Sequence, residues 1–219
     1  GGFPSPNINS NDEFINATFD ECIFMNCNKN ISGGAYKTTS YVYNKLVCLM
    51  FMLCTFENNK AVENGGALYI SEIDSCMILD SKFINNKCNG NGAAIFIDYK
   101  TESNEKTEFI SINKCEFESN TCNDGYAIYI AGEYDRNELE IINNKFTNNY
   151  LAQTVDKSSI IKSETCVFSR EEILQKNTFN NDIDNVNEYL CTSETETYEP
   201  TITDESYPTS SSSPTSSSL

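Results

Sequence analysis

The chain of 219 residues contains no histidine, no tryptophan and only two arginines, Arg136 and Arg170. Without histidine, the Ser–His and Cys–His pairs that activate a nucleophile are excluded, and a general base would have to be a carboxylate, a lysine or a tyrosine. A zinc site would need four dispersed thiolates, since none of the ten cysteines stands in a Cys-x-x-Cys spacing. We therefore expect no catalytic residue, no metal site and no cofactor.

Basic residues and long apolar runs are also scarce. Fifteen lysines and arginines stand against 32 acidic residues, which gives a formal charge of −17. Nucleic acids and anionic membranes are bound through basic patches, so we expect neither as a partner. No run of 18 apolar residues occurs, and we expect no membrane span within this chain. We also expect the chain to be a monomer.

Proline is missing between Pro6 and Pro200. A region without proline suits strands whose backbone donors all enter ladders. The segments between turn residues are short, rich in Ile, Phe, Tyr, Leu and Thr, and far below helical length. This pattern predicts an all-β fold.

A unit of 27 to 34 residues recurs along the chain, and each unit has a phenylalanine anchor. The anchors are Phe24, Phe56, Phe83, Phe117, Phe146 and Phe179. Three residues after the anchor, four units carry an asparagine: Asn59, Asn86, Asn120 and Asn149. Eight or nine residues after the anchor, four units carry a glycine block, whose first residues are Gly33, Gly65, Gly92 and Gly125. In the second unit, Gly66 follows Gly65. An internal period of this length is typical of stacked repeat architectures.

Two further columns precede the anchor. Five residues before it stand apolar residues: Phe19, Phe51, Ile78, Ile112, Ile141 and Leu174. Two residues before it stand small or polar residues: Cys22, Cys54, Ser81, Cys115, Asn144 and Asn177. The anchor and the apolar column are an odd number of residues apart, so a straight strand would place them on opposite faces. A bend between them is required if both are buried.

Together these columns predict a single-stranded parallel β-helix of the pectin-lyase-like type, with three sides and about six coils. Identical residues of successive coils would stack about 4.8 Å apart. The phenylalanines would then form one buried stack. The asparagines would hold the corners, because asparagine tolerates tight turns and hydrogen-bonds to its own kind when stacked.

The paired tetrapeptides Gly-Gly-Ala-[Ile/Leu/Val] and Phe-x-x-Asn resemble the repeats of the chlamydial polymorphic outer membrane proteins and of related trichomonad surface proteins. The resemblance is carried by residues 65–68 with 56–59, and more loosely by 92–95 with 83–86 and by 125–128 with 117–120. It covers about residues 15–185. It implies a right-handed β-helix and a surface-displayed adhesin, located at the cell surface or outside the cell. These repeats are structural positions, so they specify the scaffold better than the function.

The composition divides the chain into three parts. Residues 1–14 would be an N-terminal flank or cap, and residues 15–191 would form the β-helix. Residues 192–219 are rich in Ser and Thr, contain three prolines and carry acidic but no basic side chains. Such a segment buries too little apolar surface to order itself, and we expect a disordered stalk.

The ten cysteines leave disulfide formation open. Cys22 with Cys54, and Cys88 with Cys122, would be neighbours one coil apart, within the Cα separation that a disulfide permits. Cysteine also interchanges with Ser81 in one column, which is typical of a small packing residue.

An aromatic row is the candidate binding site. If Leu68, Ile70 and their counterparts point inward, then Tyr69, Phe96 and Tyr129 line the outside of the third face. An exposed aromatic row would suit a host-cell protein or glycan as partner. Long connections across the row, or the opposite parity, would remove this surface.

Three acids are candidates for a calcium-dependent, pectate-lyase-like site: Asp80, Asp98 and Asp135. The column pattern favours a solvated charge ladder instead, because Asp80 lies one coil from Lys114 and because Lys82, Glu116 and Lys145 alternate in sign. We therefore expect an adhesin-like surface protein that is not an enzyme. A polysaccharide lyase or hydrolase and a structural spacer in a larger surface protein stay open as alternatives.

Overall fold

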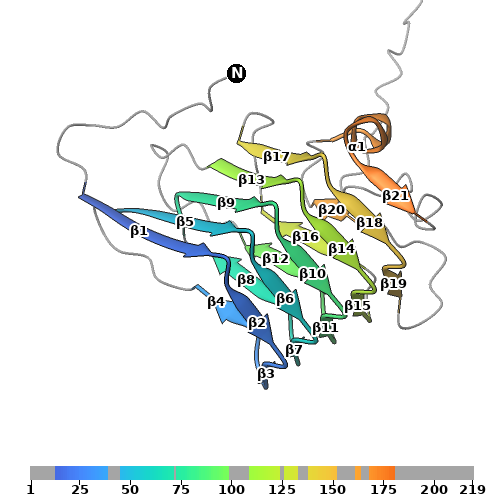
Figure 1. Cartoon of the computed structure of the whole chain (residues 1–219), viewed down its shortest axis with the longest axis horizontal. Coiled ribbons are helices and arrows are strands. Elements are labelled where there is room, and N and C mark those ends of the chain that lie inside the picture. Colours follow the sequence, from blue (N-terminus) through green and yellow to red (C-terminus); the bar gives the residue numbers. More distant parts are fainter. Residues whose placement is uncertain are drawn as a thin grey trace, which may run out of the picture.

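The computed structural model describes residues 13–38, 45–71, 73–98, 109–123, 126–132, 138–151, 161–163 and 168–180. Within them the chain winds into a parallel β-helix, and each strand pairs with the equivalent strand of the next coil (Figure 1). The fold class predicted from the repeat is confirmed. The predicted stalk, residues 192–219, and all but the last two residues of the predicted flank lie outside the described residues.

Four sheets run along the helix. Sheet A contains β1 (Glu13–Asp20), β5 (Lys45–Met52), β9 (Ser75–Leu79), β13 (Phe109–Asn113) and β17 (Leu139–Ile142). Sheet B contains β2 (Ile23–Met25), β6 (Thr55–Glu57), β10 (Lys82–Ile84), β14 (Glu116–Glu118), β18 (Lys145–Thr147) and β21 (Thr178–Asn180). Sheet C contains β3 (Asn28–Lys29), β7 (Lys60–Ala61), β11 (Lys87–Cys88), β15 (Thr121–Cys122) and β19 (Tyr150–Leu151). Sheet D contains β4 (Tyr36–Lys37), β8 (Leu68–Ser71), β12 (Ile95–Asp98), β16 (Ile128–Ala131) and β20 (Ile161–Ser163).

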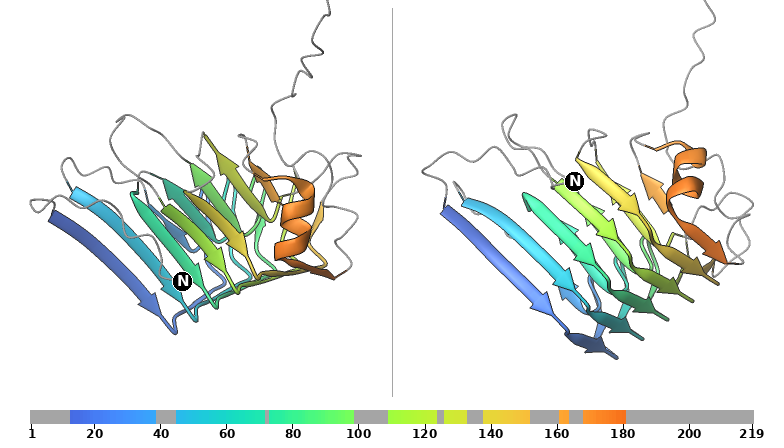
Figure 2. Two further views of the ribbon diagram at one scale, coloured as in Figure 1. Left: turned by 90° about the horizontal axis from the view of Figure 1, so that it is seen from above. Right: turned by 45° about the horizontal axis from the view of Figure 1, so that its top comes forward.

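The number of sides and the number of coils differ from the prediction. Sheet C is a fourth side that was not predicted, because its two-residue strands are too short to show a periodic pattern. Sheets A, C and D each stack five strands, and sheet B has a sixth. The solenoid therefore has about four turns, slightly fewer than the six coils predicted. The coils follow one another along the rod in sequence order (Figure 2).

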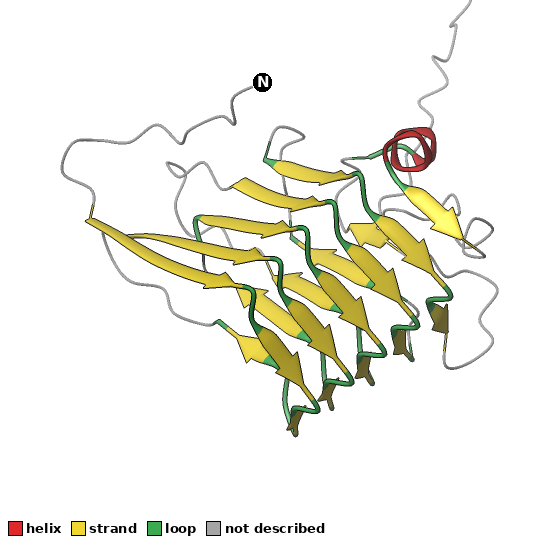
Figure 3. Ribbon diagram, viewed as in Figure 1, coloured by secondary structure: helices red, strands yellow, loops and turns green. Residues whose placement is uncertain are grey.

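A helix replaces the sheet A strand of the sixth unit (Figure 3). Helix α1 (Arg170–Lys176) begins after Ser169, whose hydroxyl accepts a hydrogen bond from the Glu172 backbone N–H, and its first turn is acidic while its last turn is basic. These are favourable capping and dipole interactions. Leu174, which the repeat assigned to the apolar column, therefore lies in α1 rather than in a strand.

The predicted bend between the apolar column and the anchor is made by a left-handed residue. Three residues before the anchor, the φ angle is positive in five coils: Glu21, Leu53, Asp80, Lys114 and Asn143. Two residues after the anchor, it is positive again: Asn26, Asn58, Asn85, Ser119 and Asn148. Each strand of sheet B except β21 thus lies between two tight corners, which allows both the anchor and the apolar column to face the interior.

The anchor phenylalanines form one continuous stack, as predicted. Consecutive rings are nearly parallel, and their centroids are 4.8 to 5.0 Å apart from Phe24 to Phe179. Phe56, Phe83, Phe117 and Phe146 have no exposed surface. Their spacing equals the distance between paired strands, so the register of sheet B and the stacking of its rings fix each other.

The asparagine column forms a buried amide ladder. The Nδ2 of Asn86 donates to the Oδ1 of Asn120 in the next coil at 3.0 Å and to the backbone oxygen of Phe56 in the preceding coil at 2.9 Å. Its Oδ1 accepts hydrogen bonds from the Nδ2 and the backbone N–H of Asn59. Asn59, Asn86, Asn120 and Asn149 are all buried, and this ladder satisfies their side chains inside the rod.

A second polar column lies two residues before the anchor. Asn144 repeats the amide pattern, donating to the Oδ1 of Asn177 and to the backbone oxygen of Ile112. In the earlier coils, a thiol or hydroxyl replaces the amide: Ser81 donates to the Leu79 carbonyl and accepts from the Cys54 N–H. The sequence identified these positions as small or polar, but it did not reveal that they form hydrogen bonds between coils.

The glycine block is required by backbone geometry. Gly65 has a φ of +67°, a region that residues with a side chain rarely adopt. A Cβ on Gly66 would lie 2.1 Å from the backbone oxygen of Ala93 in the next coil. Gly92 repeats the positive φ, while Gly125 lies outside the described residues.

Replacing Phe83 by alanine should lower the free energy of unfolding by about 3 to 5 kcal/mol, because it leaves a cavity between two stacked rings. The control is Ile84→Ala, which truncates a half-buried side chain of the same strand and should cost about 1 kcal/mol or less. Denaturant-induced unfolding measures both. Equal losses in the two variants would contradict a ring stack that stabilises the fold.

Replacing Asn86 by aspartate should destabilise the protein by about 3 kcal/mol or more at neutral pH, since a carboxylate cannot donate the two buried hydrogen bonds. Burial raises the pKa of the introduced carboxyl in the folded state. Stability should therefore be highest below the ordinary aspartate pKa of about 3.9 and should be lost as the pH rises through the folded-state value. Asn85→Asp, at an exposed corner, is the matched control and should show neither effect. Thermal unfolding measured across the acidic pH range tests this. If Asn86→Asp and Asn85→Asp showed the same dependence of stability on pH, the buried ladder would be refuted.

Candidate interaction surface

The aromatic row predicted from the sequence lies on the outer face of sheet D. Leu68, Ile70 and their equivalents in β12 and β16 point into the core, which is the parity that an outward-facing row requires. Between them, Tyr69, Phe96 and Tyr129 are register partners on successive strands. The same column continues to Lys37 on β4 and to Lys162 on β20. The row is thus three aromatic residues with a lysine at each end.

The members of the row contact one another closely. The rings of Tyr69 and Phe96 are stacked with centroids 5.2 Å apart, and those of Phe96 and Tyr129 are 5.3 Å apart. At one end, the Lys37 Nζ lies 4.7 Å from the centre of the Tyr69 ring, a cation–π contact. The Tyr69 hydroxyl donates to the Oδ2 of Asp98 at 2.7 Å.

At the other end, Tyr126 joins the row. Its ring centroid is 5.3 Å from that of Tyr129. The Lys162 Nζ lies 5.2 Å from the centre of the Tyr126 ring and donates to its hydroxyl at 3.2 Å. Both lysines therefore hold aromatic side chains in place and still present a charge at the ends of the row.

The expected exposure of the row is wrong for two of its three aromatic residues. Phe96 is only 6% exposed and Tyr129 is 9% exposed, whereas Tyr69 is half-buried. The reason is that Phe96 is sandwiched between two rings and that Tyr129 is also packed against Tyr126. The side chains of the row that a partner can reach consequently lie at its two ends: Lys37 with Tyr69 at one end and Lys162 at the other.

The candidate acids of a lyase site are not brought together. Asp80 lies at an exposed corner between sheets A and B, and Asp98 lies at the end of β12 in sheet D. Asp135 lies outside the described residues. Within the described part of the chain, no three histidine, cysteine, aspartate or glutamate residues are grouped to hold a metal ion. The predicted charge ladder is present at one step, where the Lys82 Nζ lies 3.4 Å from the Glu116 Oε2.

The described cysteines are free thiols, and most of them donate a hydrogen bond to a backbone carbonyl oxygen. Cys88 and Cys122 are register partners as predicted, yet each thiol donates to carbonyl oxygens of its own coil. Burial raises the pKa of the Cys115 thiol to about 12, and burial likewise raises the pKa of the Cys76 thiol. Both thiols thus stay protonated at neutral pH and are poor nucleophiles.

The two lysines of the row were not identified from the sequence. Their signal was present, because Lys37 follows the first glycine block in the position that Tyr69 holds in the second unit. Lys162 was harder to place, since the fifth unit lacks the glycines that define the register.

This arrangement defines a class: a parallel β-solenoid whose short coils are joined by phenylalanine and asparagine ladders. Two consecutive coils, residues 53–71 and 80–98, match the Chlamydia polymorphic membrane protein repeat. The resemblance stated from the two tetrapeptides is thereby confirmed. That family is located at the outer membrane and cell surface, in agreement with the extracellular or cell-surface location predicted for this chain.

No curated protein and no solved structure matches the chain. Among the helical residues that the structure describes, none forms a helix long and apolar enough to cross a membrane.

Alkylation with iodoacetamide should distinguish two groups of thiols. Cys22 and Cys27, which are partly exposed, should be modified in the folded protein. Cys76 and Cys115 should react only after unfolding, because they are buried and protonated. Peptide mass spectrometry with and without denaturant measures this difference. Labelling of Cys115 in the native protein as fast as that of Cys27 would mean that the second polar column is open to solvent.

Proposed function

We propose that this protein is an adhesin-like surface protein that binds a host-cell protein or glycan through an outer face of its β-solenoid and does not catalyse a reaction. The observation that carries the proposal is the row on sheet D, in which aromatic side chains and two lysines are held on one face of a scaffold that carries a surface-protein repeat. Stacked ladders keep this face rigid, so binding would need little reordering.

The chemistry of the row suits such a partner. Aromatic rings offer apolar area with few rotatable bonds, and lysine ammonium groups donate hydrogen bonds to carbonyl, hydroxyl or carboxylate oxygens. Tyr69 with Lys37 is the part of the row that combines both properties on partly exposed side chains. The overall acidity of the chain favours a partner that is neutral or basic around the contact.

Cell binding tests this proposal. The full chain is expected to bind cultured epithelial cells, and the double variant Lys37→Ala with Tyr69→Ala should bind about tenfold more weakly, the equivalent of about 1.4 kcal/mol. Lys82→Ala removes an exposed lysine of sheet B and should bind like the unmodified chain. Pretreating the cells with a glycosidase or with a protease then separates a glycan from a protein ligand.

Failure would take recognisable forms. If the unmodified chain does not bind cells at all, the adhesin proposal is wrong and a structural spacer is the better description. If binding is strong but equal in all three proteins, the adhesin role holds and the row on sheet D is not its site.

A lyase assay tests the enzyme alternative. Incubation with polygalacturonate or alginate in the presence of calcium should yield no unsaturated product in the ultraviolet, because Asp80 and Asp98 lie on different faces of the rod. Product formation that disappears in Asp80→Asn, and persists in Asp98→Asn, would instead assign catalysis to the corner between sheets A and B.

A further inference from the structure

The second polar column joins successive coils through its side chains, and at its first step both residues are cysteines. In the later coils, the Nδ2 of Asn144 donates to the Oδ1 of Asn177 at 3.1 Å. At an inner step, the backbone N–H of Cys54 donates to the Oγ of Ser81 at 3.0 Å. Side chains of this column therefore reach the neighbouring coil. At the first step of the column, Cys22 and Cys54 are the neighbours.

The backbone places Cys22 and Cys54 opposite each other. The residues that follow them, Ile23 and Thr55, are register partners in sheet B, and the Thr55 backbone N–H donates to the Cys22 carbonyl oxygen at 2.8 Å. Paired strands lie about 4.8 Å apart, which falls within the Cα separation of about 4.4 to 6.8 Å found in disulfides. Only side-chain rotation and a small approach of the Cβ atoms remain for such a bond to close.

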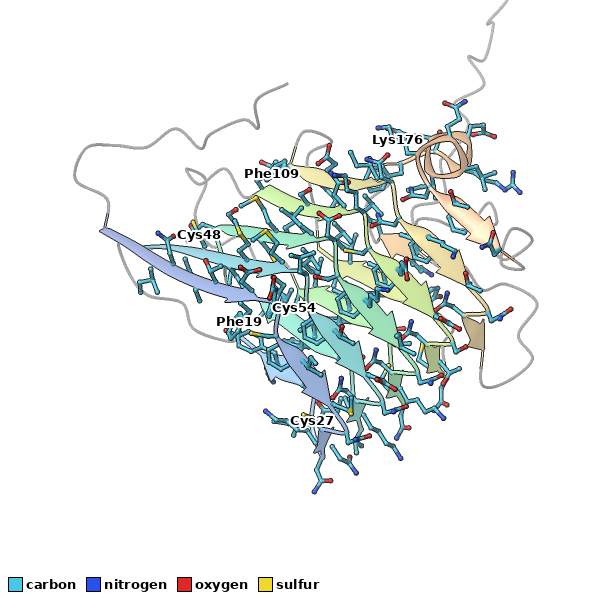
Figure 4. All side chains as sticks on the ribbon, in the orientation of Figure 1. Phe19, Cys27, Cys48, Cys54, Phe109 and Lys176 are labelled. Carbon is cyan, nitrogen blue, oxygen red and sulfur yellow. The ribbon has the colours of Figure 1, made fainter. Side chains whose placement is uncertain are left out.

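The Cys54 thiol points toward the first coil. Its Sγ donates to the backbone oxygen of Phe19, a residue of that coil, at 3.3 Å (Figure 4). The Cys22 thiol donates to the Asp20 carbonyl oxygen, also at 3.3 Å. Burial raises the pKa of the Cys54 thiol, and the charge of a Cys22 thiolate raises it as well. Because electrostatic effects weaken with distance, the two thiols are close neighbours.

The two thiols differ in exposure. Cys22 is half-buried, whereas Cys54 is 1% exposed and belongs to the core. A small oxidant can therefore reach Cys22 directly. Cys27 is half-buried as well, but its neighbour in the next coil is Asn59, whose Oδ1 accepts a hydrogen bond from the Cys27 backbone N–H. Cys22 thus combines a reachable thiol with a second thiol beside it.

Cys88 and Cys122 are a second pair of cysteines in register, and their surroundings differ. Both are buried. The Cys88 thiol donates to the backbone oxygens of Gly90 and Asn91, and the Cys122 Sγ accepts a hydrogen bond from the Tyr126 backbone N–H at 3.1 Å. These bonds hold each sulfur atom within its own coil. This pair therefore serves as an internal control for the first.

We propose that Cys22 and Cys54 are a redox site, at which a low-molecular-weight disulfide converts the two thiols into a bond that fastens the first coil to the second. The Cys22 thiolate attacks one sulfur of the small disulfide and releases the first small thiol. The Cys54 sulfur then attacks the Cys22 sulfur and releases the second. Two electrons pass from the cysteines to the small disulfide, and both cysteine protons end on the released thiols.

The location and the position in the rod suit such a bond. The family of the matching repeat lies at the outer membrane and cell surface, where disulfides persist. Among the described coils, the first has a neighbour on one side only, and terminal elements open most easily. A bond from Cys22 to Cys54 would prevent the first coil from separating while the rest of the rod stays folded. The proposal does not depend on the adhesin role.

Controlled oxidation followed by peptide mapping tests the site. The reduced full chain is incubated with a mixture of reduced and oxidised glutathione, and the remaining thiols are blocked with N-ethylmaleimide in denaturant. After digestion with trypsin, tandem mass spectrometry assigns each cysteine. Fragmentation of the peptides is required, because residues 1–29 and residues 46–60 contain two cysteines each.

We expect most molecules to contain the bond between Cys22 and Cys54, with Cys27 blocked and with Cys88 and Cys122 still reduced. A Cys22 thiol that stays free would overturn the proposal. A Cys22 that ends as a mixed disulfide with glutathione, in a bond to Cys27, or in a cross-link between two chains on a non-reducing gel would do the same. Equal oxidation of Cys88 and Cys122 would mean that exposure does not select the site, and it would also overturn the proposal.

The variant Cys54→Ser tests what the bond does. Serine stands in the same column at Ser81, where it bonds to the Leu79 carbonyl and to the Cys54 N–H, so the variant should fold with an unchanged circular dichroism spectrum. Oxidation should raise the melting temperature of the unmodified chain by about 5 °C or more. This shift should vanish in Cys54→Ser and persist in the matched control, Cys122→Ser. A bond that forms without the shift would contradict its role in fastening the first coil.

Discussion

The hydrogen-bonded asparagine ladder is the interaction on which the rest of the structure depends. A buried amide has two donors and one acceptor oxygen, and inside a packed core all of them need partners. The asparagine of the next coil and a phenylalanine carbonyl of the preceding coil accept from each amide, as Asn120 and Phe56 do from Asn86. A slip of one residue would leave several amides unsatisfied and would turn every side chain of the sheet to the other face. The polar ladder therefore specifies register, while the phenylalanine stack contributes fully buried rings to the apolar core.

The corners follow from the same constraint. In each of five coils, one left-handed residue before the anchor and one after it turn the chain so that the apolar column, the anchor and the asparagine column all face the interior. In the four units with a glycine block, the distance from anchor to glycine stays at eight or nine residues, so most of the length variation of these units falls after the glycines. Residues that form ladders are thus held constant, whereas the row on sheet D borders the part of each coil that is free to change. This explains why the scaffold and the candidate interaction surface are separable in sequence.

Much of the fold could be predicted because equivalent residues of successive repeats stack on one another, so one alignment shows which residues are in contact. The phenylalanine stack and the asparagine ladder follow from the alignment alone, whereas the inward direction of Leu68 and Ile70 is one of two parities that the alternation allows. Sheet C could not be predicted, since two residues contain no period. Helix α1 was missed because the repeat assigned Leu174 to a strand and outweighed the capping signal of Ser169. The exposure of Phe96 was misjudged because burial by two neighbouring rings is a property of the packed row, not of its alternation.

The uniformity of the inner coils also bears on how long such a rod can become. Each inner coil offers phenylalanine and asparagine on its upper side and accepts the same residues from below, so any two inner coils fit each other. A duplication or deletion of one whole unit would leave the phenylalanine and asparagine contacts chemically unchanged, because coils interact only with their nearest neighbours. The length of the rod could then be changed in steps of about 4.8 Å, the thickness of one coil. Gene rearrangements, rather than point substitutions, would be the natural way for this architecture to change its dimensions.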